Sequence, residues 1–321
     1  MRRVALIYNP MSGQHPERRA AQIAEVQAAL HDAGIEVRII ATESPESAGR
    51  QAQEAVREGC DTILACGGDG TVHEVLQRLV GGSAALGVIP MGTANALATD
   101  LGLPSSPVKA VKMLLTAKPV RISVGHVFYR SVEGGERARY FIVAAGVGAD
   151  AFFFSRLDSR LKQRFGYVAY LMEALRLWAT YTFPMFTASF MEIGSETPRD
   201  EEVSQLLAVR ISNFVGLVNN LVPGASISNG KLRVIAFKTF SRVRYLRFLT
   251  SVIFGRHHYA RTIELVKCVS VECRSREDSA ERLFVEADGE LLGTLPVRIE
   301  VVPQALTLLI PDKAMHRMSG I

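Results

Sequence analysis

Apolar and polar positions follow a regular alternation along the first third of the chain. Short apolar runs with the length and the β-branched content of buried strands occur at positions 4–8, 36–40, 62–66 and 86–89. Between these runs, apolar residues recur three or four positions apart, as at Ile23, Val26 and Leu30, which is the spacing of one helical face. Strands that alternate with helices predict an α/β fold with a parallel sheet covered on both faces.

The pattern changes near residue 120. From there on, runs rich in valine, isoleucine and phenylalanine are separated by turn residues, as in RISVGHVFYR and QLLAVRISNF. Two helical segments interrupt them, one at 167–182 and one that begins at Ser241. This pattern is typical of antiparallel β-structure with helical insertions. We therefore expect a domain boundary near residue 120.

The composition is that of an ordinary globular protein. The chain has 321 residues, of which 48% are hydrophobic and 21% charged, so it is long enough for two domains. The cysteines lack CxxC spacing, which indicates reduced thiols rather than disulfides or a zinc site. They are Cys60, Cys66, Cys268 and Cys273. This cysteine usage predicts a cytoplasmic protein.

No segment of the sequence has the pattern of a membrane span. The first apolar run ends at Asn9 and is too short for a signal peptide. The most apolar long stretch begins at Tyr167 and is interrupted by Glu173 and Arg176. The net charge of +5 is small for this length, so it does not require nucleic acid as a partner, although it permits attraction to an anionic membrane surface.

Three glycine-rich loops each follow one of the expected strands. They are NPMSG (9–13), GGDGT (67–71) and PMGTAN (90–95). The carboxyl ends of parallel strands meet at one edge of a sheet, where such folds bind their ligands. One glycine-rich turn is commonplace, but three at one edge favour a phosphate site. Glycines let backbone N–H groups approach phosphate oxygens, and the helices that follow add the positive ends of their dipoles.

The polar side chains of these loops fit a nucleotide. Thr71 and Thr93 offer hydroxyl groups to phosphate oxygens. Asp69 would repel phosphate, so we expect either a Mg²⁺ ion beside it or an acceptor hydroxyl whose proton it takes. Neither a Walker A sequence nor a GxGxxG fingerprint after the first strand is present.

Together the loops resemble the diacylglycerol kinase catalytic-domain family, which includes bacterial lipid kinases and the sphingosine and ceramide kinases. The resemblance rests on NPMSG, on GGDGT followed by HEV, and on PMGTAN. It continues through AAGVGAD (144–150), NGKL (229–232) and DGE (288–290), and so spans essentially the whole chain. GGDGT alone is shared with NAD kinases and phosphofructokinases, whereas the ordered set is specific to the lipid kinases.

The resemblance implies a two-domain architecture. Residues 1–120 would form an α/β nucleotide-binding domain with a parallel sheet, of the NAD-kinase and phosphofructokinase type, to which residues 306–321 return. Residues 121–305 would form an antiparallel β-sandwich that holds the lipid substrate. ATP would lie in the cleft between the domains, and a hydroxyl of diacylglycerol or a related lipid would accept its γ-phosphoryl group.

The resemblance also implies roles for individual residues. Glu290 would be the general base, Asp69 and Asp288 the other catalytic acids, and Glu74 would extend towards the nucleotide sugar. The Asp288-Gly289 pair by itself predicts a hairpin turn, which would present Glu290 to the cleft. The nucleotide site would comprise Asn9, Ser12, Gly13, Thr42, Gly67, Gly68, Asp69, Gly70, Thr71, Val72, His73, Glu74, Gly92, Thr93 and Asn95. A structural Mg²⁺ site would comprise Ser226, Asn229 and Lys231.

Three positions depart from the pattern of many bacterial members. Ala96, Ser123 and Asn229 stand where those relatives carry acidic residues. Asn229 can still offer a carbonyl oxygen, but the loss of a negative charge lowers the affinity for a cation. Asp69 and the acids of the DGE segment keep a minimum set for ATP·Mg²⁺ and base chemistry. Two alternatives stay open: a degenerate member that binds nucleotide or lipid without turnover, and a kinase of a soluble acceptor such as NAD.

The segment Ser241–Lys267 sets arginines among aromatic and aliphatic residues. A helix over 243–254 would either lie on an anionic bilayer or pack on the sandwich with its arginines in solvent. The apolar segment 167–182 would lie in the core or around an acyl chain. His257 and His258 have the character of surface residues, since no further ligands accompany them. We expect a peripheral protein at the inner face of the membrane, and the sequence leaves a homodimer open.

Overall fold

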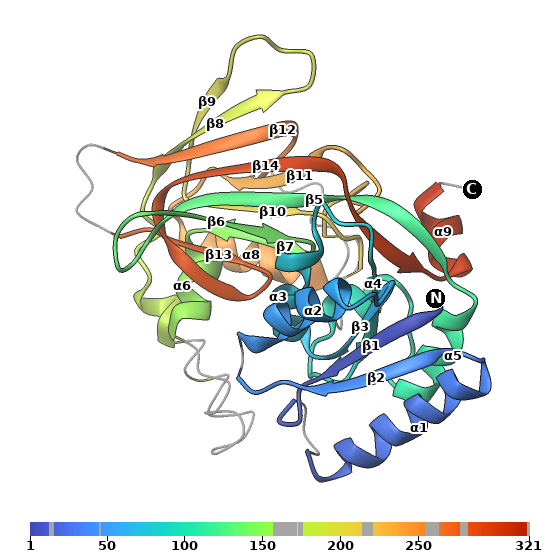
Figure 1. Cartoon of the computed structure of the whole chain (residues 1–321). Helices are drawn as coiled ribbons and strands as arrows, with labels where there is room; N and C mark the ends of the chain where they lie inside the picture. Colours follow the sequence, from blue (N-terminus) through green and yellow to red (C-terminus); the bar gives the residue numbers. More distant parts are fainter. Residues whose placement is uncertain are drawn as a thin grey trace.

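The strands of the molecule form one continuous sheet that passes through two regions of different architecture (Figure 1). The computed structural model describes residues 1–12, 16–44, 46–156, 172, 176–213, 221–253, 263–276 and 282–319. Within them the strand order is β2-β1-β3-β4-β14-β13-β7-β10-β11-β12-β8-β9, and β5 pairs with β14 and with β6.

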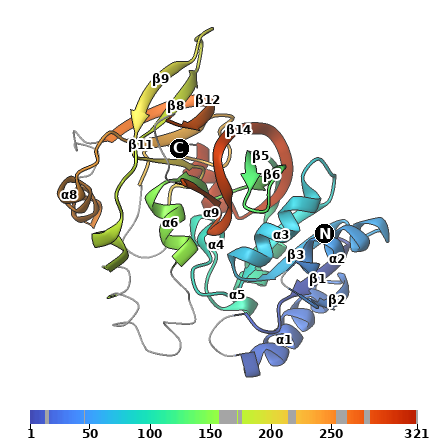
Figure 2. The same ribbon diagram turned by 90° about the vertical axis from the view of Figure 1, so that its left-hand side faces the viewer.

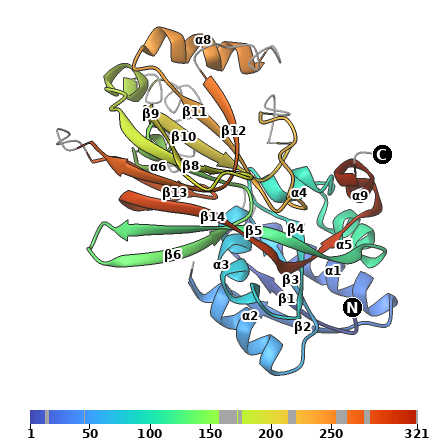
Figure 3. The same cartoon turned by 90° about the horizontal axis from the view of Figure 1, so that it is seen from above.

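The first region is a parallel sheet with helices on both faces. Its strands, which pair in parallel, are β1 (Arg3–Tyr8), β2 (Glu36–Ala41), β3 (Thr62–Gly67) and β4 (Ala85–Pro90). Its helices are η1 (Pro16–Arg18), α1 (Arg19–Asp32), α2 (Ser47–Arg57), α3 (Asp69–Leu79), α4 (Ala96–Asp100) and α5 (Pro107–Leu115). Helices α1 and α5 contact each other on one side of the strands, and α2 and α3 contact each other on the opposite side (Figure 3).

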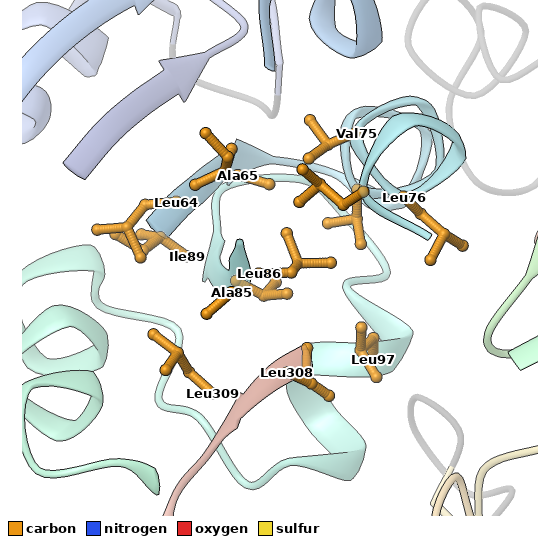
Figure 4. Packing of buried hydrophobic residues seen from close by; sticks show 14 of the residues in the cluster. Leu64, Ala65, Val75, Leu76, Ala85, Leu86, Ile89, Leu97, Leu308 and Leu309 are labelled. Carbon is orange, nitrogen blue, oxygen red and sulfur yellow. The ribbon is translucent and has the colours of Figure 1, made fainter. Parts of the chain in front are cut away.

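The central strands of this region are apolar along their length because both faces of the sheet are covered. Every residue of β3 and of β4 is buried. Figure 4 shows Leu64 and Leu86 in one cluster with Leu97 and with Leu308 of β14 (Glu290–Ile310). The core of the first region therefore includes residues from the C-terminal part of the chain.

The second region consists of antiparallel strands. Besides β14 they are β5 (Lys118–Ser131), β6 (Glu136–Phe141), β7 (Ala144–Val147), β8 (Phe186–Glu192), β9 (Arg199–Val203), β10 (Gln205–Val209), β11 (Leu232–Phe237), β12 (Ile263–Ser275) and β13 (Phe284–Ala287). Two described helices accompany them, α6 (Ala149–Arg156) and α8 (Arg242–Ile253). Cys268 and Cys273 in this region and Cys60 and Cys66 in the first are buried free thiols, as predicted.

Strand β14 carries the sheet from the second region back into the first. It pairs in antiparallel fashion with β5, and at its end Thr307 and Leu308 pair in parallel with β4. Figure 2 shows the curved path of β14 between the two regions. Helix α9 (Asp312–Ser319) follows, and its Ala314 joins the core of the first region. Because β5 and β14 both run through the two regions, the domain limits at residues 120 and 305 stay a prediction.

Several predicted features lie partly or wholly outside the described residues. Gly13, His257 and His258 are outside them, and the segment 167–182 is described only at 172 and 176–182. In that described part Leu177 is buried, whereas Met172 is exposed. No helix among the described residues combines the length and the apolar character needed to cross a membrane.

Candidate active site

The loops that follow β1, β3 and β4 lie at one edge of the parallel sheet and are hydrogen-bonded to one another. The N–H of Asn9 donates to the carbonyl of Cys66 at 3.2 Å, and the N–H of Met91 donates to the carbonyl of Gly67 at 2.9 Å. Loops that are far apart in the sequence therefore form one surface, as expected for the carboxyl edge of parallel strands.

Two of these loops touch at glycines. A Cβ added to Gly92 would lie 2.4 Å from Cα of Gly68, which is closer than a side chain can approach. The amide side chain of Asn95 holds the loop after β4 closed. Its Oδ1 accepts from the N–H of Gly92 and its Nδ2 donates to the carbonyl of Gly92, both at 2.9 Å. Glycine is required here because the two backbones meet directly.

Asp69 begins α3 and reaches across to the start of α4. Its carboxylate accepts hydrogen bonds from the N–H groups of Asn95 at 2.9 Å and of Ala96 at 2.7 Å. Burial raises the pKa of Asp69, and these two N–H groups oppose that shift without reversing it. The aspartate of GGDGT thus fixes the loop after β4 to the start of α3.

The other residues predicted for the nucleotide site differ in their access to this edge. Thr93 is exposed, and Ser12 and Thr42 are half-buried. Thr71 and Val72 are buried on α3, so their side chains belong to the packing of the helix. Their backbone N–H groups both donate to the carbonyl of Gly68, at 3.1 and 3.2 Å, so they begin the hydrogen bonding of α3.

Arg19 is a residue of this edge that the sequence analysis missed. Its side chain is buried, and its Nη2 donates to the carbonyls of Ser12 and of Met91, the latter at 3.2 Å. The guanidinium therefore ties the loop after β1 to the loop after β4. Nothing in the local sequence distinguishes Arg19 from the exposed Arg18 beside it, because the contact depends on the fold.

Asp288 and Gly289 form the tight turn between β13 and β14. Their φ angles of +50° and +84° are those of a two-residue hairpin turn, as the DG pair predicts. The carboxylate of Asp288 is buried and accepts from three successive N–H groups at 2.8 to 3.1 Å, those of Ile142, Val143 and Ala144. Asp288 is therefore anchored by backbone N–H groups. Its buried carboxylate has a positioning role and is not exposed to solvent.

His73 connects this turn to α3. The imidazole is fully buried, with Nδ1 3.3 Å from Oδ2 of Asp288 and Nε2 3.8 Å from Oε2 of Glu290. Burial lowers the pKa of His73, but the hydrogen bond to Asp288 and the charges of Asp288 and Glu290 outweigh it and raise the pKa overall. His73, predicted to contact nucleotide, is instead a buried link between two acids.

Glu290 is the partly exposed acid beside the GGDGT loop. Its side chain is 37% exposed, and its Oε1 would lie 3.3 Å from a Cβ added to Gly70 of the GGDGT loop. Burial raises the pKa of Glu290, while His73 lowers it, and the net shift is upward. A partly buried carboxylate with a raised pKa beside a candidate phosphate-binding loop is suited to accept a proton.

Glu74 is paired within the protein. Its Oε1 lies 2.8 Å from Nη1 of Arg139 on β6, and both side chains are largely buried. The carboxylate predicted to approach a nucleotide sugar is therefore held by an arginine that the sequence analysis did not single out.

The residues predicted for a structural magnesium ion do not fit a divalent cation. The carbonyl of Ser226 accepts from the N–H of Asn229 at 3.1 Å, and the amide Nδ2 of Asn229 donates to the carbonyl of Gly224 at 3.1 Å. The carbonyl of Lys231 accepts from Nη1 of Arg210 at 2.9 Å, and this guanidinium would repel a metal ion. Among the described residues, no group of three or more His, Cys, Asp or Glu side chains is arranged to hold a metal.

Two buried acids behind the turn were not assigned a role from the sequence. The carboxylate oxygens of Asp150, the last residue of AAGVGAD, are buried, and this burial raises the pKa of Asp150 to about 7. Glu286 accepts from the N–H of Gly289 at 2.9 Å, and burial and the charge of Asp150 raise its pKa. The motif AAGVGAD includes Asp150, but only the fold shows that its carboxylate is buried.

Comparison with known families divides the chain into two consecutive parts. Residues 3–127 match the diacylglycerol kinase catalytic domain, and residues 142–310 match the domain described as the YegS C-terminal NAD kinase beta sandwich-like domain. The class that fold and site define is thus a kinase with a catalytic domain followed by a β-sandwich-like domain. The chain belongs to the diacylglycerol kinase family, which confirms the resemblance seen in its motifs.

Individual relatives align over nearly the whole chain. A diacylglycerol kinase of Bacillus subtilis is 29% identical over 321 residues, which is 99% of this chain and 99% of that protein. A diacylglycerol kinase of Staphylococcus saprophyticus is 26% identical over 97% of this chain and 96% of its own length. A Bacillus anthracis crystal structure described as a candidate diacylglycerol kinase has a TM-score of 0.75 at 21% identity, covering 97% of this chain and 96% of that chain. At that identity the structural likeness shows the fold alone.

Proposed function

We propose that the protein is an ATP-dependent lipid kinase that transfers the γ-phosphoryl group of ATP to a hydroxyl of diacylglycerol or a related lipid. The observation that carries this proposal is the position of Glu290, a partly buried carboxylate beside the GGDGT loop that is connected through His73 to the anchored Asp288. Membership of the diacylglycerol kinase family supports kinase chemistry, and relatives at 26–29% identity carry the name diacylglycerol kinase.

The edge formed by the three loops is suited to the phosphates of a nucleotide. Backbone N–H groups of residues 68–70 at the start of α3 would bind phosphate oxygens, with the positive end of the helix dipole behind them. Arg19 adds a fixed positive charge beneath two of the loops. ATP would supply the phosphoryl group, and its Mg²⁺ would neutralise charge on the phosphates, with Asp69 as the nearest carboxylate of the loop.

Glu290 would take the proton of the lipid hydroxyl. Phosphoryl transfer asks a protein mainly to position its reactants, with a carboxylate near the acceptor hydroxyl. The raised pKa of Glu290 makes it a better proton acceptor than an exposed glutamate. The charge of the buried His73 opposes this rise in the pKa of Glu290.

Helix α8 offers a surface for the membrane that holds a lipid substrate. Tyr245 and Phe248 pack against Phe237 on its inner face. Its outer side leaves large apolar side chains exposed, Phe240 just before the helix by 76% and Val243 by 73%. The exposed basic residues Arg242, Arg244 and Arg247 lie on the same helix. In Figure 3, α8 lies at the outer margin of the second region. Apolar side chains beside arginines complement an anionic bilayer, so we infer peripheral attachment through this side.

The test is phosphoryl transfer to a panel of acceptors. Purified protein is incubated with labelled ATP, Mg²⁺ and either lipid vesicles or soluble acceptors that include NAD. We expect label in a solvent-extractable lipid, lost in Asp69→Ala and Glu290→Ala but kept in Glu133→Ala, which removes an exposed carboxylate of a surface turn. Transfer of label to NAD alone would indicate a kinase of a soluble acceptor and not a lipid kinase. ATP binding without transfer to any acceptor would favour the degenerate member.

A further inference from the structure

The interior of the second region contains a complete arginine side chain. Arg210 follows β10 and has no exposed surface, which makes it the largest fully buried side chain among the described residues. Its Nη1 donates to the carbonyl of Lys231 at 2.9 Å, and its Nη2 donates to the carbonyls of Ser123 at 2.9 Å and of Ile227 at 3.2 Å. No carboxylate in the described part of the chain forms an ion pair with it.

A buried charge of this kind is costly unless polar groups replace its hydration. Here three carbonyl oxygens converge on one cation, one from Ser123 on β5 and two from the loop 221–231, at Ile227 and Lys231. Converging carbonyl oxygens are also the surroundings in which proteins bind hard metal ions. The guanidinium therefore has the kind of environment that a bound cation would have.

The guanidinium of Arg210 binds a carbonyl that belongs to the set expected to hold magnesium. Lys231 belongs to the predicted metal set, and Ile227 lies between Ser226 and Asn229 of that set. Ser123 and Asn229 carry no charge. The loop therefore receives no negative charge from these two positions and has a permanent positive charge buried against it.

We propose that Arg210 is a built-in cation that replaces a divalent metal ion at the loop 221–231 and holds this loop against β5. The proposal does not depend on the kinase reaction. It accounts together for the engaged carbonyl of Lys231, for the neutral residues at 123 and 229, and for a buried guanidinium without a carboxylate partner.

Arg210 is also connected to the candidate active site through the residues that follow it. Two and three residues further on, the N–H groups of Ser212 and Asn213 donate to Oδ1 of Asp100 at 3.1 and 2.9 Å. Asp100 ends α4, and the N–H of Ala96 at the start of α4 donates to Asp69. Arg210 is therefore a positioning residue, which stabilises the segment against which α4 and the GGDGT aspartate are held.

The first test is metal content and metal response without nucleotide. Wild-type protein is dialysed against EDTA and then metal-free buffer, and bound metal is measured by mass spectrometry. We expect no stoichiometric metal, and a melting temperature that EDTA or millimolar MgCl₂ changes by less than about 1 °C. A retained equivalent of metal, or a clear rise of the melting temperature with MgCl₂, would overturn the proposal.

The second test exchanges the two kinds of cation. Arg210→Met removes the guanidinium from the carbonyls of Ser123 and Lys231, whereas Ile227 keeps the N–H of Ser123 as a donor. It should lower the melting temperature by about 4 °C or more. Arg233→Met is the control, because Arg233 donates to the nearby carbonyl of Gly224 at 3.4 Å from a more exposed position. It should lower the melting temperature by less than Arg210→Met. Arg210→Lys keeps the charge and should recover part of the loss. An Arg210→Met variant as stable as wild type would contradict the proposal.

The double variant Arg210→Met, Asn229→Asp gives the sharpest distinction. It removes the guanidinium and supplies a carboxylate at the same loop, so it should gain a stabilising response to MgCl₂ that wild type and the variant Asn229→Asp alone lack. If Asn229→Asp alone responds equally, then Arg210 does not occupy the place of the metal. If the double variant folds and shows no response, the place that Arg210 fills is not a cation site.

Discussion

Nε2 of His73 lies 3.8 Å from Oε2 of Glu290, so a fully buried imidazole on α3 contributes to the charge environment of a partly exposed acid. The other nitrogen of the ring is 3.3 Å from Asp288, whose carboxylate is anchored by three backbone N–H groups. The sequence of contacts from Asp288 through His73 to Glu290 joins the turn after β13 to the GGDGT helix. This connection makes the ionisation of Glu290 depend on a residue that no ligand can touch.

Replacing His73 should therefore change the pH dependence of the kinase. Glu290 accepts a proton only when ionised, so activity falls as the pH falls through its pKa. The charge of His73 lowers that pKa, so His73→Gln should raise it and move the acid limb of kcat/KM to higher pH. Rate profiles between about pH 5 and pH 9 measure the shift. The exposed His31→Gln serves as control, and an acid limb that stays in place in His73→Gln would remove His73 from this role.

The contact between two glycines should control nucleotide binding. In Gly92→Ala the new methyl group would lie 2.4 Å from Cα of Gly68, so the two loops must move apart. We expect the KM for ATP to rise by about 10-fold or more, because small displacements of binding groups are costly. Gly230→Ala is the matched control, since nothing lies within 4 Å of its added Cβ. Equal ATP affinity for both variants, measured by calorimetry, would show that the loops tolerate separation.

The buried Asp150 should make stability depend on pH. Burial raises the pKa of Asp150 to about 7, above the pKa of a carboxyl group in an unfolded chain. The contribution of protonated Asp150 to the free energy of unfolding is therefore fully present at low pH, and it is lost as the pH rises through the folded-state pKa. Asp150→Asn cannot ionise. The melting temperature of Asp150→Asn relative to that of wild type should therefore rise by several degrees from about pH 5 to pH 8. The exposed Asp312→Asn is the control, and parallel melting curves for wild type and Asp150→Asn would contradict this account.

The outer side of α8 should determine binding to anionic vesicles. Val243→Glu places a negative charge among exposed apolar and basic side chains, and should weaken co-sedimentation with phosphatidylglycerol vesicles by about 10-fold. Val132→Glu makes the same change at an exposed valine of a β-turn and should have no effect. Equal loss in both variants, or equal binding of wild type to zwitterionic vesicles, would argue against attachment through α8.

Local patterns in the sequence predicted the parts of the site that depend on near neighbours. The three glycine-rich loops follow β1, β3 and β4, and Asp288-Gly289 forms a two-residue turn. Glycine and turn residues act on the backbone where they stand, so their spacing is informative without the fold. For the same reason, the motif order identified the family.

The rest of the site depends on contacts between distant residues. His73 and Asp288 are 215 positions apart, and Glu74 and Arg139 are 65 apart. No periodicity shows that Glu74 finds an arginine or that Arg210 is wholly buried. Burial and pairing arise from the tertiary fold, so the sequence named Glu74 and Asp288 as ligand-facing residues where the structure gives them partners within the protein.

The central claim is that Glu290 takes the proton from a lipid hydroxyl during phosphoryl transfer. The most direct measurement is the single-turnover rate from labelled ATP to diacylglycerol in mixed micelles, for wild type and Glu290→Gln, with the Kd for ATP measured in parallel. We predict a rate at least about 100-fold lower in Glu290→Gln, with ATP affinity unchanged within about 2-fold. A variant that transfers phosphate to the lipid at the wild-type rate would contradict the account.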